Sequence, residues 1–263
     1  MKKILFAGGS LIFSLLCHAQ QNAGKVVYER AAQVRISLGE NAGGEQAQTR
    51  IDKFELNFAN NQSLWRQSEK EADDNGDINQ GGVQIRTIIA GSDDVLYNNF
   101  SEAKRVELRV FFDKKFIIDD SIRPLKWKLG EDTKTILNHV CRKATATTVV
   151  PSMRMTIDNG VMQRKEVQDT TVVTAWYASD IPVAAGPAEY QGQLPGLILA
   201  LDINNGRQVY KAVEISDKAD IVSIKAPTGK KHYTLAAFRI ERDKLLEEMQ
   251  KNSQGGNRRI QVN

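Results

Sequence analysis

Residues 175–199 read AWYASDIPVAAGPAEYQGQLPGLIL, and this stretch decides how the rest of the chain is organised. Three of the chain's six prolines, Pro182, Pro187 and Pro195, lie in it. Proline fixes the backbone angle φ and glycine lifts the restriction that a side chain imposes. Residues 178–196, called the Pro/Gly loop below, are therefore predicted to form a stiff connection. A strand-like run ends before the loop, and an almost wholly apolar run begins after it.

Two interpretations of the loop stay open from the sequence. In the structural one, Pro195-Gly196 forms a rigid corner, with Trp176 buried on the inner face of a sheet and Gly196 at positive φ. In the other, the loop is a rigid surface offered to a partner. The residues that form the motif in either interpretation are the following: Trp176, Tyr177, Pro182, Gly186, Pro187, Gly192, Leu194, Pro195, Gly196, Leu197 and Ile198.

The pattern from residue 26 onward is alternation with a period of two, which is typical of strands. Val26, Tyr28 and the alternate positions up to 36 share one face. Asn60-Asn61 predicts a hairpin turn, since Asn tolerates positive φ, and residues 158–160 and 204–207 predict two more. Further strands are predicted at residues 95–97, 106–112, 126–129, 133–137, 140–150, 153–157, 161–167, 172–177, 197–203, 208–215 and 221–224.

Helical spacing appears only near the C-terminus. Thr234 can cap a helix that runs to residue 251 and carries one apolar stripe, made of Leu235, Phe238, Leu245 and Met249. The chain is therefore predicted to be mostly β, with a C-terminal helix. With about a dozen strands, we expect a single antiparallel, strongly curved sheet, an open or half barrel whose concave side is filled. A two-sheet β-sandwich is the alternative.

The N-terminus predicts export. Lys2 and Lys3 precede an apolar run over residues 4–16, and small residues before a cut at Ala19/Gln20 fit a cleaved signal peptide of residues 1–20. Cys17 leaves a lipoprotein alternative open. We expect a single β-rich domain over residues 21–250, a disordered tail over residues 251–263, and no transmembrane segment in the mature chain. The predicted location is the periplasm or the periphery of the outer membrane.

Several motifs follow one another in an order known from one protein family. They lie at residues 115–121, 127–128, 133–136, 141–144, 175–177, 181–182, 186–187 and 194–198. In this order the chain resembles the GLPGLI family, exported proteins of Bacteroidetes-type bacteria whose function is not established. The resemblance implies no catalytic or ligand residues. Two departures are Gln193, where the family motif has Gly, and residues 149–170, which resemble an inserted hairpin.

Composition and motifs exclude several functions. The chain has 36 basic and 32 acidic residues, and removal of Lys2 and Lys3 leaves a net charge of +2, which is too weak and too evenly spread for nucleic-acid binding. Asp73 begins a calcium-like pattern that lacks the required Gly and Glu. No phosphate-binding, zinc-protease or nucleophile-elbow motif is present, and we expect no cofactor.

One soft-metal hypothesis remains. His139 and Cys141 share a strand spacing that Met153 and Met155 repeat, and sulfur and nitrogen ligands suit Cu(I) or zinc. In the competing interpretation, Asn138 is a turn residue that points His139 elsewhere, and the methionines fill gaps.

Together these observations predict a non-catalytic exported envelope protein that binds either an apolar ligand or an envelope partner protein. The first alternative is an accessory protein of an outer-membrane transporter. The others are a carboxylate enzyme without a recognisable motif and a copper binder.

Overall fold

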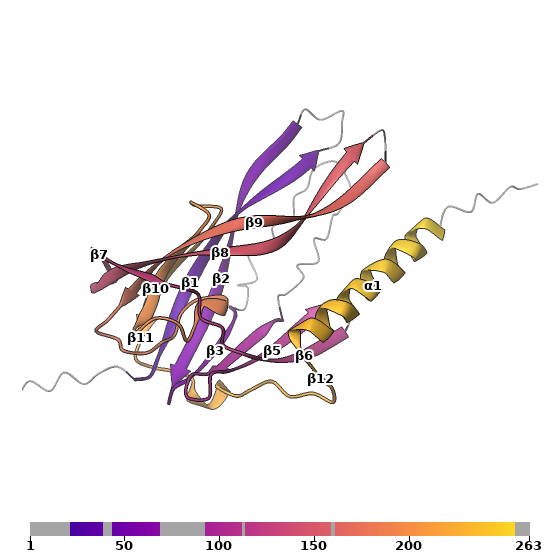
Figure 1. Ribbon diagram of the computed structural model, residues 1–263. Coiled ribbons are helices and arrows are strands. Elements are labelled where there is room, and N and C mark those ends of the chain that lie inside the picture. The colour runs from indigo at the N-terminus through magenta and orange to yellow at the C-terminus, as the bar shows by residue number, and fades with distance from the viewer. Residues whose placement is uncertain (1–21, 39–43, 69–92, 112–113, 159–160, 256–263) are drawn as a thin grey trace, which may run out of the picture.

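The computed structural model describes residues 22–38, 44–68, 93–111, 114–158 and 161–255, and the fold in these ranges is dominated by strands (Figure 1). In chain order the strands are β1 (Gly24–Leu38), β2 (Gly44–Ala59), β3 (Gln62–Gln67), β4 (Val95–Asn99), β5 (Lys104–Phe111), β6 (Lys114–Ser121), β7 (Lys128–Ile136), β8 (His139–Asp158), β9 (Val161–Ala178), β10 (Leu197–Ile203), β11 (Gln208–Ser216) and β12 (His232–Tyr233). The helical elements are the 3₁₀ turns η1 (Ala188–Tyr190) and η2 (Ile221–Ser223) and the helix α1 (Leu235–Gly255).

All described strands belong to one open sheet in the order β12-β6-β5-β4-β3-β2-β1-β11-β10-β9-β8-β7. Each pairing is antiparallel except the parallel pair of β12 with β6. The sheet curves strongly, so that side chains from β11, β1, β2, β3, β4 and β5 line one common groove on its concave face. The predicted curved sheet with a C-terminal helix is confirmed, and the two-sheet sandwich is not formed.

Short turns set the register of the hairpins, as the sequence predicts. Asn60 and Asn61 have φ of 52° and 58° between β2 and β3, and Asn204 and Asn205 have 54° and 52° between β10 and β11. The turn before His139 uses Leu137 and Asn138 in the same left-handed region. Residues 159–160 lie outside the described ranges, but Asp158 pairs with Val161, so β8 and β9 form a hairpin.

The main core lies on the concave face. Phe54 stacks on Trp65 with ring centroids 4.9 Å apart, and Tyr28 packs on Trp65 at 5.4 Å. Buried apolar residues of the Pro/Gly loop belong to the same core cluster as these rings: Ile181, Val183, Tyr190 and Leu194. The concave side of the sheet is therefore filled by the chain's own loop.

The convex face is covered by residues 217–231, which connect β11 to β12. Ile224 packs against an apolar cluster from β2 to β6, and the Asp220 amide donates to Asn57 Oδ1 over 3.1 Å. The strand predicted at residues 221–224 is wrong, because this segment crosses the sheet as a 3₁₀ turn and pairs with no neighbour.

The C-terminal helix packs on β6. The Ala237 amide donates to Thr234 Oγ1, which confirms the predicted cap, and Phe238 is buried against Phe116 and Ile118. The helix extends to Gly255, so residues 251–255 are helical rather than part of a tail. No helix in the described ranges is both long and apolar enough to span a bilayer.

Three further predictions fall on residues outside the described ranges: the signal peptide, the calcium-like pattern at Asp73 and the tail beyond residue 255. Two predictions on β8 differ from the structure, because residues 140–150 and 153–157 form one continuous strand. Pro151 lies within this strand and pairs in register with Gln168.

Candidate functional site

The Pro/Gly loop is closed by its own backbone hydrogen bonds. The Gly192 amide donates to Ala184 O, and the Leu197 amide donates to Ile181 O. A third bond runs from the Ile198 amide to Ala185 O. Within the motif, Gly186, Pro187, Leu194, Gly196, Leu197 and Ile198 are buried, whereas Pro182 and Pro195 are exposed. The loop is thus a compact plug, with Ser179, Asp180 and Glu189 as its other exposed residues.

Long-range hydrogen bonds fix this plug to the strands opposite. Ser63 Oγ on β3 donates to Gln191 Oε1 in the loop over 2.6 Å, and Tyr28 hydroxyl on β1 donates over 2.7 Å to the backbone oxygen of Ile198, on β10 just after the loop. Both bonds are buried, where an unsatisfied polar group is costly. They therefore hold the loop in one position on the concave face.

Gln193 gives the loop a third attachment. Its Oε1 accepts hydrogen bonds from the Leu125 amide over 2.9 Å and from Trp127 Nε1 over 3.0 Å, and its Nε2 donates to Glu189 O over 3.0 Å. Glycine at this position could make none of these bonds. The departure from the GLPGLI motif thus adds a link between the loop and the segment before β7.

Gly192 and Gly196 are required for different reasons. Gly192 has φ of 74°, a conformation that side chains rarely adopt. Gly196 does not have positive φ, so that prediction is wrong. A Cβ at Gly196 would lie 2.3 Å from Ala178 O, so the requirement is the close approach of two backbone segments.

Trp176 does not lie where the sequence analysis places it. Ala175 and Tyr177 are 0% and 2% exposed, and Trp176, on the opposite face of β9, is only half-buried. Lys134 Nζ lies 4.5 Å and Lys143 Nζ 5.9 Å from the centre of its ring. Two lysines can cover an indole through cation–π contacts, so the tryptophan need not be in the core.

The soft-metal candidates are not brought together. His139 Nδ1 lies 2.7 Å from Asp180 Oδ2, and Cys141 is fully buried, with its pKa raised to about 11 by burial. Met153 lies twelve residues after Cys141 on the same strand, and Met155 fourteen. At about 3.3 Å per residue these positions are roughly 40 Å apart or more, so the two pairs cannot share one ion. Among the described residues, no three His, Cys, Asp or Glu side chains are grouped as metal ligands.

A polar groove of about 350 Å³ opens on the concave face beside the loop. We call it the concave groove. Its aromatic lining consists of Phe54, Trp65 and Tyr210. Its charged lining consists of Arg30, Arg105, Arg109, Asp94, Glu107 and Glu189. No local motif in the sequence predicts this site, because its residues come from six strands and η1.

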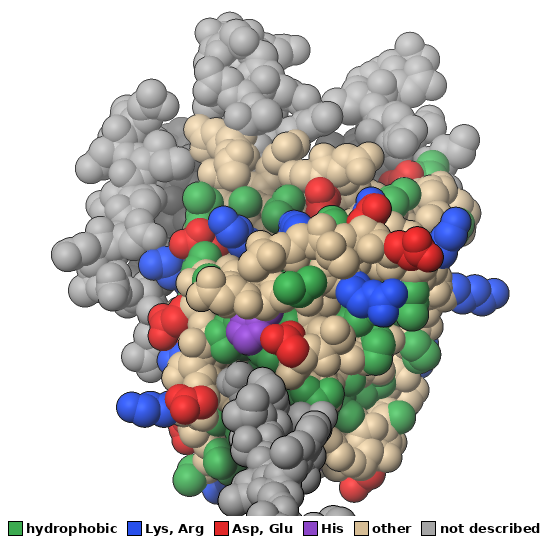
Figure 2. Space-filling model, turned by 90° about the vertical axis from the view of Figure 1, so that its left-hand side faces the viewer, with side chains coloured by type: hydrophobic (Ala, Val, Ile, Leu, Met, Phe, Trp, Pro, Cys, Tyr) green, Lys and Arg blue, Asp and Glu red, His purple; other side chains and the backbone are tan. Residues whose placement is uncertain are grey.

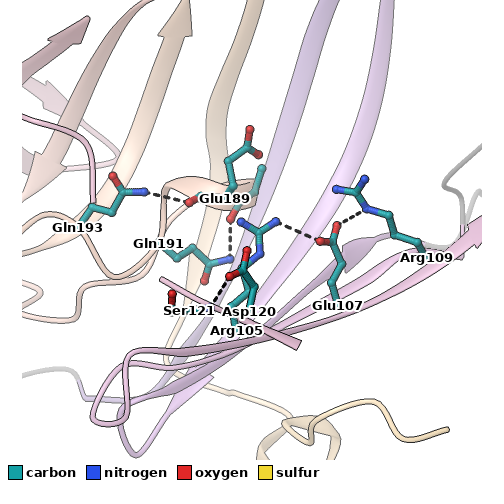
Figure 3. A network of polar contacts seen from close by, with 9 residues as sticks. Arg105, Glu107, Arg109, Asp120, Ser121, Glu189, Gln191 and Gln193 are labelled. Carbon is teal, nitrogen blue, oxygen red and sulfur yellow. Dashed lines mark hydrogen bonds and ion pairs between the residues drawn. The ribbon is translucent and has the colours of Figure 1, made fainter. Parts of the chain in front are cut away.

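The three arginines of the groove lining are held in two ion-paired groups. Asp52 accepts from Arg30 over 2.6 Å and from Arg50 over 2.7 Å. Glu107 on β5 lies between Arg105 at 3.2 Å and Arg109 at 2.7 Å, and Figure 3 shows all three side chains converging. The groove therefore offers fixed donors and acceptors of both signs.

Burial shifts several pKa values here. Burial raises the pKa of Asp94 above its usual value, although its Oδ1 accepts the Val110 amide. Burial also raises the pKa of Tyr210 to about 12. Burial would raise the pKa of Asp52 as well, but hydrogen bonds from Arg30 and Arg50 outweigh it and bring that pKa below its usual value.

One face of the molecule is shown in Figure 2, the side on the left of Figure 1. Basic and acidic side chains alternate on it, with hydrophobic side chains between them. No field of a single sign covers this face, in agreement with the weak net charge.

Comparisons with known proteins add a family match and a fold. The profile of a family described as "Protein of unknown function (Porph_ging)" matches residues 127–200, which include the Pro/Gly loop. A search of curated proteins finds no match. The chain is similar in fold to a solved structure described as "Structure of PNGF-II in P21 space group", at 16% identity and a TM-score of 0.51. That match covers 85% of this chain and 34% of the other.

A second solved structure, "Structure of PNGF-II in C2 space group", matches at 17% identity and a TM-score of 0.47, over 84% of this chain and 33% of the other. The chain thus spans about a third of the length of the solved chains that it matches. At such low identity the likeness concerns the fold alone.

Proposed function

We propose that this protein is a non-catalytic binding protein of the cell envelope that holds a polypeptide segment of a partner protein in the concave groove. The observation that carries the proposal is the lining of the groove, in which ion-paired arginines and carboxylates surround aromatic rings. A polypeptide presents donors, acceptors and charges of both signs, which this lining complements.

The filling of the concave face argues against the other ligand class predicted from the sequence, an apolar small molecule. Ile181, Tyr190 and Leu194 of the Pro/Gly loop are buried in the core cluster that contains the aromatic rings. The groove that remains carries six charged side chains, whereas sites for apolar small molecules are lined mainly by hydrophobic residues. Organic extraction of purified protein should therefore recover no bound lipid.

The envelope location rests on the sequence. The predicted signal peptide and the resemblance to the GLPGLI family both indicate export to the periplasm or the outer-membrane periphery. An envelope protein is therefore the partner that we propose. A specific case is that the partner is an outer-membrane transporter and this protein its accessory.

Site-specific photocrosslinking in cells tests the proposal. A photoreactive residue at Gln67 or Glu189, both in the groove lining, should capture one partner reproducibly. Lys211 is the matched control, because it is exposed, follows Tyr210 on β11 and so faces away from the groove. Equal capture from Lys211, or none from the groove, would refute the proposal. If the captured partner is an outer-membrane barrel protein, the result supports the specific case in which this protein is an accessory of a transporter.

A catalytic function has one observation in its favour. Asp94 lines the groove with Glu107 and Glu189, and its raised pKa is a property of catalytic general acids. The test is the mass of the captured partner after incubation with wild-type protein or with Asp94→Asn. A mass change that requires Asp94 would establish an enzyme, whereas an unchanged mass agrees with the proposed binding protein.

A further inference from the structure

A second cavity, of about 180 Å³, lies next to the concave groove between α1 and strands β5 and β6. Its walls carry four arginines: Arg105, Arg109, Arg239 and Arg242. We call it the arginine pocket. Two of the guanidinium groups project from β5 and two from the first turns of the helix. Residues three apart on a helix face the same way, so Arg239 and Arg242 lie over the same opening.

The carboxylates in the pocket do not balance these charges. Glu107 accepts one bond from Arg105 and one from Arg109, so each of its oxygens is already engaged. Asp120, the other acidic lining residue, is held by Arg123 over 2.8 Å. Four arginines against two carboxylates leave the lining with a net charge of +2. Two more charged residues pair with the lining: Arg123 with Asp120, and Asp243 with Arg242. Their charges are opposite in sign, so the net charge stays at +2.

Arg239 stands out among the four. Within the described chain its guanidinium group makes neither a hydrogen bond nor an ion pair, although it opens into a pocket that holds three other guanidinium groups. Like charges repel at such range, and a low-dielectric wall strengthens the repulsion. Phe238, Leu235 and Ile118 supply that wall, and Arg109 lies over the Phe238 ring at 5.4 Å. An anion between the arginines would relieve this repulsion.

From this arrangement we propose that the arginine pocket binds a tetrahedral oxyanion with two negative charges, such as a phosphate or sulfate group. Its charge equals the excess of the lining, and its oxygens can accept paired bonds from several guanidinium groups at once. A carboxylate has one charge and two oxygens, and would leave part of the lining unmatched. The volume is below the range for whole small molecules, so the pocket holds the anionic group itself.

This inference does not depend on the proposed polypeptide ligand. Arg105 and Arg109 line both cavities, but Arg239 and Arg242 line the arginine pocket and are absent from the lining of the groove. Variants of the helix residues therefore test the anion site alone.

Calorimetric titration of the full chain at low ionic strength tests the site. Inorganic phosphate and sulfate should bind saturably, and acetate should bind far more weakly. The double variant Arg239→Gln/Arg242→Gln should bind phosphate about tenfold more weakly or worse, which corresponds to the loss of one charged hydrogen bond. Gln is a good helix former, and Arg239 is exposed and Arg242 half-buried, so we expect the double variant to fold.

Lys244→Gln is the matched control, since it removes one positive charge from an exposed position of the same helix outside the pocket lining. It should leave phosphate affinity unchanged. Equal weakening in Lys244→Gln, acetate binding as tight as phosphate, or no saturable phosphate or sulfate binding would each overturn the proposal. A comparison of phosphoserine with inorganic phosphate identifies the source: tighter phosphoserine binding indicates a phosphorylated partner, and tighter phosphate binding a free ion.

Discussion

Two carboxylates, Asp52 and Asp94, lie on the sheet near the concave groove and show how single residues respond to opposite surroundings. Asp52 is buried between two arginines, and their hydrogen bonds favour its charged form. Asp94 lacks such partners, and burial favours its neutral form. The two residues therefore contribute to the pH dependence of folding with opposite signs.

Replacement of Asp94 by Asn should stabilise the protein at pH 7. A raised pKa means that the folded state favours the protonated acid, so stability is lost as the pH rises through the folded pKa. Asn cannot ionise and avoids this loss. The gain in melting temperature should disappear below the unfolded pKa of about 3.9. Asp93→Asn, at an exposed neighbouring position, should change little at either pH; a stabilisation equal to that of Asp94→Asn would contradict the burial argument.

Replacement of Asp52 by Asn should destabilise the protein at pH 7, by about 1.5–3 kcal/mol for the loss of charged hydrogen bonds. A lowered pKa means that the stabilisation is present above the unfolded pKa and is lost as the pH falls through the folded pKa. The difference from wild type in urea unfolding should therefore shrink at low pH. Asp132→Asn, which breaks an exposed pair with Lys143, should cost less than about 1 kcal/mol. A pH-independent difference would show that Asp52 acts through packing alone.

At the residue scale, turns are predictable from the sequence, whereas the buried face of a strand is not. Asn60 and Asn204 are identifiable because positive φ is a local property. Trp176 is placed wrongly because alternation shows which residues share a face but not which face is inside. Gly196 is assigned the wrong reason because its contact, Ala178, depends on strand pairing.

At the scale of elements, α1 is held on the sheet by the packing of Phe238 against aromatic and aliphatic side chains of β6. Phe238 lies 5.2 Å from the Phe116 ring centre in an edge-to-face arrangement, next to the half-buried Leu235 and Leu245. The parallel pairing of β12 with β6 brings the helix start to this position.

Truncation of Phe238 to Ala should cost about 3–5 kcal/mol, because it removes a buried aromatic side chain and leaves a cavity. Ile240→Ala is the matched control, since Ile240 is 57% exposed on the same helix, against 2% for Phe238. It should change stability by less than about 0.5 kcal/mol. Chemical denaturation measures both variants, and similar losses would contradict the docking of the helix through Phe238.

Elements with periodic patterns and caps are predictable, and elements defined by distant partners are not. The hairpins and the Thr234 cap follow from local sequence. Residues 221–224 have strand-like composition but meet no free strand edge, so they form a turn that covers the convex face. Pro151 suggests a break in β8. At this position, however, β8 pairs with β9 alone, and a strand with one free edge tolerates proline.

At the scale of the molecule, a curved sheet wraps around its own Pro/Gly loop. The sequence predicts the curvature and the need for a filling, but not what fills it. The deciding contacts, such as Ser63 with Gln191 and Tyr28 with Ile198, join residues more than a hundred positions apart and leave no local pattern. The concave groove and the arginine pocket leave no local pattern for the same reason, since each is assembled from elements that meet only in the folded protein.

The central claim is that the Pro/Gly loop is an internal part of the fold, which contributes only Ala188 and Glu189 to the concave groove where we propose recognition. Thermal unfolding of Gly196→Ala tests it most directly. The added Cβ would lie 2.3 Å from Ala178 O in the paired strand, and neither backbone segment can move freely. Overpacking of this kind costs about 1–3 kcal/mol, or about 2–4 °C of melting temperature for each kcal/mol.

Gly130→Ala is the matched control, because a Cβ there meets its nearest atom at an ordinary 3.5 Å. The account predicts a clearly lower melting temperature for Gly196→Ala and no loss for Gly130→Ala. If Gly196→Ala has the same melting temperature as the wild-type protein, the loop is not held against the sheet as described, and the central claim is contradicted.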